Sequence, residues 1–183
     1  MNKLFFLLFL LASFASKAQF EDNRSCKIYL KSGEVIEAMS GMRKGNHFLY
    51  HDNINSKPQK IKIIAVDFVV MSDAEGMQEK LRFLPVKGKR KIQTLQIVSL
   101  GSLELYKAQV TKKGITTEVF YVKRKGDYEA SCLLGTEENK KSILLEYAQN
   151  CPKIIEKINS EKYTLSKDIF ATVKLFNIYC ASK

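Results

Sequence analysis

Hydrophobic and polar residues alternate along the middle of the chain, in runs separated by evenly spaced glycines. Leu103 and Leu105 point one way from their run, while Glu104 and Tyr106 point the other. Short turns rich in glycine, lysine and arginine separate such runs, as between consecutive antiparallel strands. Because the runs are not similar to one another, they predict a meander and not a sequence repeat. The glycines are 76, 88, 101, 114 and 126, and the predicted strands are 79–86, 92–99, 102–108, 116–123 and 127–134.

The region before Gly76 continues the same pattern. Two alternating runs, "CKIYLK" and "EVIEAM", flank Ser32-Gly33, a signal for a two-residue hairpin. The run "HFLYH" predicts a further short strand. Residues 61–71 are almost continuously apolar, which predicts a strand buried on both faces. Asp67 interrupts this run and predicts a bulge or a strand end.

The hydrophobic period changes to that of a helix after Gly135. One stripe runs through 137–151 and another through 165–180, each ending in a cysteine. Between them, Ile154, Ile155 and Ile158 predict a short helix with Pro152 in its first turn, where no amide donor is needed.

These patterns predict an α+β fold: an antiparallel meander sheet of about eight or nine strands, with C-terminal helices packed on an apolar face. No linker rich in proline, glycine or serine separates the strands from the helices. We therefore expect a single domain over 19–183, with a β-rich part at 19–136 and a helical part at 137–183.

The first residues have the three-part layout of a secretory signal peptide. A short positive start precedes the apolar run "LFFLLFLLASFA", and Ser16-Lys17-Ala18 supplies the small residues at a cleavage site. The apolar run is too short to span a bilayer, which needs about 20 residues. We expect cleavage after residue 18, no later transmembrane segment, and an exported protein in the periplasm or at the cell surface.

The chain is basic, with a formal charge of +11 that becomes +9 once Lys3 and Lys17 leave with the signal peptide. A positive balance favours anionic partners. Outside the cytosol these are acidic glycans, lipid headgroups or lipopolysaccharide, and not nucleic acid. The alternative is that lysine-rich turns only maintain solubility. The candidate anion-binding residues form two clusters: Lys87, Lys89, Arg90 and Lys91, and then Lys123, Arg124 and Lys125.

Four cysteines allow three disulfide pairings, and the sequence alone does not choose among them. Cys151 and Cys180 end the two helical stripes, so both thiols face one seam if the helices pack side by side. In an oxidising compartment such a pair is expected to bridge. Cys26 and Cys132 would then form a second bridge. The alternative is that the cysteines are small buried apolar residues.

Few residues suggest catalysis. His47 and His51 lie four apart and could share a metal ion, but the sequence offers no clear third ligand, so incidental surface histidines are the simpler interpretation. No Cys-x-x-Cys, nucleophile elbow, phosphate-binding loop or dinucleotide fingerprint is present. The sequence therefore predicts no catalytic residue and no cofactor.

Several segments resemble a family of exported, uncharacterised proteins of flavobacteria and their relatives. They are "GEVIEA", "IAVDF", "GSLELYKA" with "FYVKRKGD", "YAQNCPKIIEKI" and "YTLSKDIFATVKLFNIYC". The resemblance implies a bacterial origin, export, and cysteines in recurring places at 151 and 180. It implies no activity.

Three functions are consistent with these patterns. The first is a non-enzymatic envelope or secreted protein that acts as a binding or accessory module for an envelope protein or an anionic ligand. The second is a basic surface that binds an anionic glycan or lipopolysaccharide. The third is a metal-dependent enzyme that uses His47 and His51.

Overall fold

A computed structural model describes residues 24–53, 55–160 and 163–180. The predicted signal peptide, 1–18, lies outside these residues. No helix within the described ranges combines the length and the apolar character needed to cross a bilayer.

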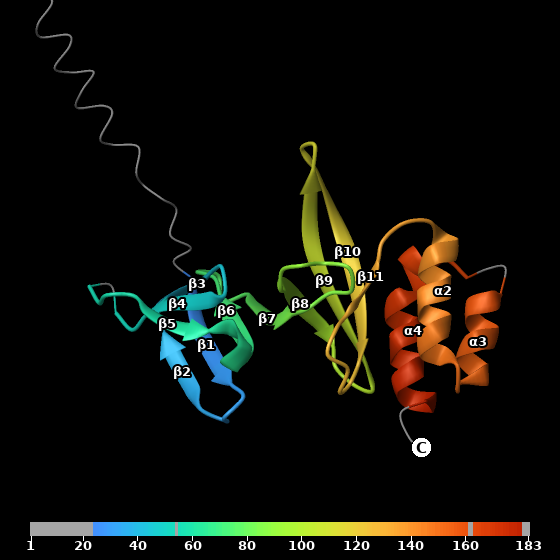
Figure 1. The fold of residues 1–183 in the computed structure, drawn as a ribbon, viewed down its shortest axis with the longest axis horizontal. Coiled ribbons are helices and arrows are strands. Elements are labelled where there is room, and N and C mark those ends of the chain that lie inside the picture. The colour runs from blue at the N-terminus through green and yellow to red at the C-terminus, as the bar shows by residue number, and fades with distance from the viewer. Residues whose placement is uncertain (1–23, 54, 161–162, 181–183) are drawn as a thin grey trace, which may run out of the picture.

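The main sheet has eight antiparallel strands, in the order β11-β10-β9-β8-β7-β6-β1-β2. Six consecutive strands, β6 to β11, form the predicted meander, and the β1–β2 hairpin is added beside β6. In Figure 1 the sheet runs from the N-terminal strands at one end of the molecule to the helices at the other. Its strands are β1 (Ser25–Leu30), β2 (Val35–Ala38), β6 (Val66–Ser72), β7 (Gln78–Leu84), β8 (Gln93–Ser99), β9 (Leu103–Lys112), β10 (Ile115–Arg124) and β11 (Ser131–Leu133).

A second sheet packs against the N-terminal part of the first. It consists of β3 (Ser40–Lys44), β4 (His47–His51) and β5 (Gln59–Lys62), followed by a short 3-10 turn, η1 (Ile63–Ala65). A buried cluster that includes Ile28, Phe48 and Val69 fills the space between the two sheets. Gly41 is required here, because a Cβ atom would lie 2.6 Å from Phe48 Cε1 and 2.7 Å from Cys26 Sγ.

Three helices cover one face of the C-terminal strands (Figure 1). They are α2 (Glu137–Ala148), α3 (Pro152–Asn159) and α4 (Leu165–Tyr179). Their apolar stripes meet Leu103, Leu105 and Val122 of the sheet in the largest buried cluster. The Asn177 side chain fixes α4 to the start of β9, since it accepts a hydrogen bond from Leu103 N at 2.8 Å and donates one to Leu103 O at 2.9 Å.

Strand β9 is buried on both faces at its N-terminal end. Leu103 and Leu105 face the helices, whereas Glu104 and Tyr106 face the opposite side. The Glu104 carboxylate is 3.0 Å from Lys123 Nζ of β10 and 3.4 Å from Arg82 Nη1 of β7. It also accepts a 2.7 Å hydrogen bond from the Tyr106 hydroxyl. Burial raises the pKa of Tyr106, as does this hydrogen bond, so the hydroxyl stays protonated and able to donate.

The same network reaches β6. Arg82 Nη2 lies 3.0 Å from the Asp67 carboxylate, and Arg82 Nη1 donates to the Tyr106 hydroxyl at 3.0 Å. Asp67 is the residue that interrupts the apolar run of 61–71, and it is bulged out of the register between β1 and β6, because Tyr29 pairs with Phe68 and Leu30 with Val66. The bulge predicted at Asp67 is confirmed.

The predicted fold class is confirmed: a large antiparallel sheet is followed by helices. Helices α2 and α4 begin and end close to the limits of their predicted stripes, and α3 has Pro152 in its first turn, as predicted. Two strand predictions were too long. The run 127–134 contains only β11, and the run 61–71 contains the end of β5, the turn η1 and most of β6. The separate three-stranded sheet was not predicted.

We expect Lys123→Met to lower the free energy of unfolding by about 3 kcal/mol or more, because it leaves the buried Glu104 carboxylate without its closest cation. The substitution keeps most of the side-chain volume. Chemical denaturation of the two proteins measures the difference.

The matched control is Lys125→Met, which removes the same charge two residues away at an exposed position and should change stability by less than about 0.5 kcal/mol. Equal stability of the two variants would show that the Lys123–Glu104 ion pair contributes nothing.

Candidate ligand-binding cleft

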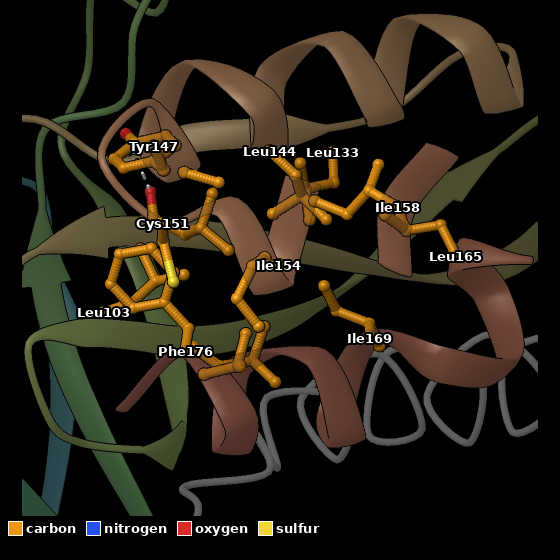
Figure 2. Close-up of a cluster of buried hydrophobic side chains, with 14 of the residues drawn as sticks. Leu103, Leu133, Leu144, Tyr147, Cys151, Ile154, Ile158, Leu165, Ile169 and Phe176 are labelled. Atoms are coloured by element: carbon orange, nitrogen blue, oxygen red, sulfur yellow. Dashed lines mark hydrogen bonds between the residues drawn. The ribbon is translucent and has the colours of Figure 1, made fainter. Parts of the chain in front are cut away.

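A disulfide joins the helices at one end of the helical layer. Cys151, directly before α3, bonds to Cys180, directly after α4, and their Cα atoms are 5.7 Å apart. The pairing predicted from the two helical stripes is confirmed. Cys151 is 5% exposed and belongs to the large buried cluster, where Figure 2 shows it beside Tyr147 and Phe176.

The second predicted disulfide is wrong. Cys26 on β1 and Cys132 on β11 are both free thiols. Five strands separate β1 from β11 in the main sheet, so the two sulfurs cannot meet. Cys26 is instead a small buried residue between the two sheets, and burial raises the pKa of its thiol to about 11.

The two histidines lie on one face of β4, as expected from their spacing, but no third ligand joins them. His51 Nδ1 is 2.9 Å from Ser56 O, and Gln59 donates a hydrogen bond to the Asp52 carboxylate. Among the described residues there is no group of three or more histidine, cysteine, aspartate or glutamate side chains that could hold a metal ion.

Two residues of the second predicted basic cluster make contacts within the fold. Lys123 is 6% exposed and paired with Glu104. Arg124 points to the other side of β10 and donates to Glu146 O at 3.2 Å and Tyr147 O at 2.7 Å. It therefore covers the carbonyl end of α2, which has no basic residue in its own last turn.

The first basic cluster lies on the turn between β7 and β8, with Lys87, Lys89, Arg90 and Lys91 all exposed. This turn pairs with the segment before β11, since Lys87 N donates to Ala130 O at 2.9 Å. Lys87 and Arg124 together line a hollow of about 290 Å³, which brings the two clusters together at one point. Asp127 and Glu146 line the same hollow and offset its positive charge.

A larger cleft of about 1000 Å³ lies around the disulfide. Four segments form it: the residue before β9, the end of β10 with the turn after it, the junction of α2 and α3, and the last turn of α4. One wall is apolar and includes Tyr147, Phe176 and the disulfide itself. The lining residues are Ser102, Arg124, Lys125, Tyr147, Asn150, Cys151, Pro152, Lys153, Phe176, Tyr179 and Cys180.

The cleft is positively charged. Arg124, Lys125 and Lys153 line it, and the described residues of its wall include no aspartate, glutamate or histidine. No ion pair within the described ranges neutralises Lys125 or Lys153, and both are exposed. Lys153 Nζ lies 4.4 Å from the centre of the Tyr179 ring, a cation–π contact at the edge of the cleft.

Of the predicted anion-binding residues, Arg124 and Lys125 line this cleft, whereas Lys87, Lys89, Arg90, Lys91 and Lys123 do not. Sequence analysis missed Lys153 and Tyr179. A signal was available, since these residues lie two positions after Cys151 and one before Cys180, and the predicted disulfide brings both to the same place.

The fold and the cleft together define an α+β protein with a basic, disulfide-walled cleft at the end of its helical layer. Comparisons of the chain with protein-family models, curated proteins and solved structures found no match.

The two free cysteines, Cys26 and Cys132, should react with an alkylating reagent in a fixed order. Cys132 is partly exposed on the edge strand β11, while Cys26 is buried with a pKa of about 11 against the usual 9.0. At pH 8 the Cys26 thiolate is therefore about 100-fold less abundant than that of an ordinary thiol. Alkylation of the native protein, followed by peptide mass spectrometry, should label Cys132 first and Cys26 only on unfolding. Early labelling of Cys26 would contradict its place in the core.

Loss of the disulfide should destabilise the helical layer. The bridge spans 29 positions, for which the chain-entropy model gives about 3.6 kcal/mol. We expect the Cys151→Ser and Cys180→Ser double variant to unfold at a correspondingly lower denaturant concentration. Non-reducing peptide mapping of the unmodified protein should recover a linked 151–180 peptide, and a 26–132 linkage would refute the arrangement of the sheet.

Proposed function

We propose that this protein is an exported, non-enzymatic binding module that holds an anionic ligand in the basic cleft beside the Cys151–Cys180 disulfide. The observation that carries the proposal is the cleft's charge: it has three cations and no carboxylate among its described lining residues. An anionic group placed there gains attraction from Lys125 and Lys153 without displacing an existing ion pair.

Export is supported by two independent features. The N-terminal sequence has the layout of a secretory signal peptide. The disulfide requires an oxidising compartment to persist, such as the periplasm or the cell surface. The resemblance to exported flavobacterial proteins agrees with both features and stays a prediction.

A binding role fits the cleft better than catalysis does. General acid–base chemistry near neutral pH most often uses a histidine or a carboxyl group in reach of the substrate. The described residues of the cleft wall supply neither, and their two cysteines are joined in the disulfide. The metal-enzyme alternative is weaker still, because His47 and His51 find no third ligand among the described residues.

The test is a double charge reversal, Lys125→Glu with Lys153→Glu. The probes are an acidic polysaccharide (polygalacturonate), phosphatidylglycerol vesicles and inorganic phosphate. We expect at least one probe to bind the unmodified protein, with an affinity that falls as salt rises. The double variant should bind that probe about 10-fold more weakly or worse, which corresponds to about 1.4 kcal/mol.

The matched control reverses Lys60 and Lys112, two exposed lysines on β5 and at the tip of the β9–β10 hairpin. It makes the same change in net charge and should retain most of the binding. If the two double variants lose affinity equally, only the overall charge matters and the cleft is not the site. Failure of every probe to bind, or binding insensitive to the cleft variant, would also refute the proposal.

A further inference from the structure

We infer that the cleft's ligand is an acidic saccharide, with one sugar ring stacked on Tyr179 and its acid group held by Lys153 and Lys125. This inference rests on the proposed function and goes further, because it names the chemical class of the anion. It follows from the exposed aromatic ring, the small apolar wall and the size of the cleft.

Tyr179 is the exposed aromatic ring of the cleft. It is the last residue of α4 and is 55% exposed, whereas the other two aromatic residues in the wall, Tyr147 and Phe176, are each 6% exposed. Lys153 Nζ lies over one face of the Tyr179 ring, 4.4 Å from its centre, so the sugar ring of the inferred complex stacks on the opposite face. A sugar ring offers an apolar C–H face to an aromatic ring, and an acid substituent at its edge then lies within reach of the same lysine.

The apolar wall is too small for a lipid chain. Tyr147, Phe176 and Cys151 are only 5–6% exposed and direct most of their surface into the buried cluster (Figure 2), so they leave little apolar surface to the cleft. An acyl chain would need a longer apolar groove to offset the cost of ordering it. A sugar ring needs only one aromatic face, with polar groups such as Asn150 around it.

The cleft also has more room than a simple anion requires. Its volume of about 1000 Å³ lies at the upper end of the range for small-molecule sites. Its cations stand on separate segments, Lys125 after β10 and Lys153 on α3. A ligand with several rings and more than one acid group satisfies both features, whereas inorganic phosphate fills only a fraction of the space.

The experiment is calorimetric titration with trigalacturonate, a trisaccharide with one carboxylate on each ring. The neutral galactose trisaccharide and inorganic phosphate serve as comparison ligands. We expect trigalacturonate to bind most tightly. Tyr179→Ala should weaken it about 3- to 10-fold, the range for loss of one aromatic contact, while Tyr179→Phe keeps the ring and should bind nearly as well as the unmodified protein.

Tyr128 provides the matched control, since it is a tyrosine 75% exposed in the segment between β10 and β11 and outside the cleft wall. Tyr128→Ala should leave trigalacturonate binding unchanged. Phosphate binding, which does not use the ring, should be equal in the unmodified protein and in Tyr179→Ala.

The outcomes separate the two proposals. Suppose that phosphate or phosphatidylglycerol vesicles bind and that the Lys125 and Lys153 reversal lowers their affinity. If trigalacturonate then does not bind, or binds Tyr179→Ala as tightly as the unmodified protein, the cleft is an anion site and the saccharide inference is wrong. Stronger binding of the neutral trisaccharide would also overturn it. If no anionic probe responds to the charge reversal, the proposed function itself fails.

Discussion

The structure depends on the burial of strand β9 on both of its faces. Leu103 and Leu105 fill the interface with the helices, and on the opposite side the Glu104 carboxylate is removed from water. A buried carboxylate is tolerated only where cations and hydrogen-bond donors surround it. Arg82 and Lys123 supply the cations and Tyr106 a donor, so one acidic residue ties β7, β9 and β10 together.

This constraint also shapes the cleft. Because side chains alternate along β10, holding Lys123 against Glu104 sends Arg124 to the helical side, where it covers the end of α2. Lys125 follows at the turn and is exposed beside the cleft. Asn177 holds α4 against the sheet through its hydrogen bonds to the Leu103 backbone. The Cys151–Cys180 disulfide, which joins the start of α3 to the end of α4, forms part of the cleft wall. The close approach of α4 explains Gly101, where a Cβ atom would lie 2.5 Å from the Asn177 side chain.

The charge of the molecule is thus divided between two uses. Lys123 and Arg124 satisfy groups inside the fold, while Lys87 shares a hollow with Asp127 and Glu146. Around the disulfide, exposed cations and an exposed tyrosine line one cleft, and the described residues of its wall include no carboxylate. The net charge alone therefore overstates how much of the surface is available to an anion. An anion can bind only where the lysine and arginine side chains are not already paired with groups of the protein.

The sequence by itself determined the meander from β6 to β11 and the three helices, because these follow from local periodicity. It favoured the Cys151–Cys180 pairing, and a bulge or a strand end at Asp67, without excluding the alternatives. It did not determine the second sheet, the separation of Cys26 from Cys132, or the burial of Lys123. Those depend on which strands pair across long stretches of chain, and a strand's own residues do not specify its neighbour. The cleft likewise exists only in the tertiary structure, since Lys125, Lys153 and Tyr179 come from three segments that packing and one disulfide bring together.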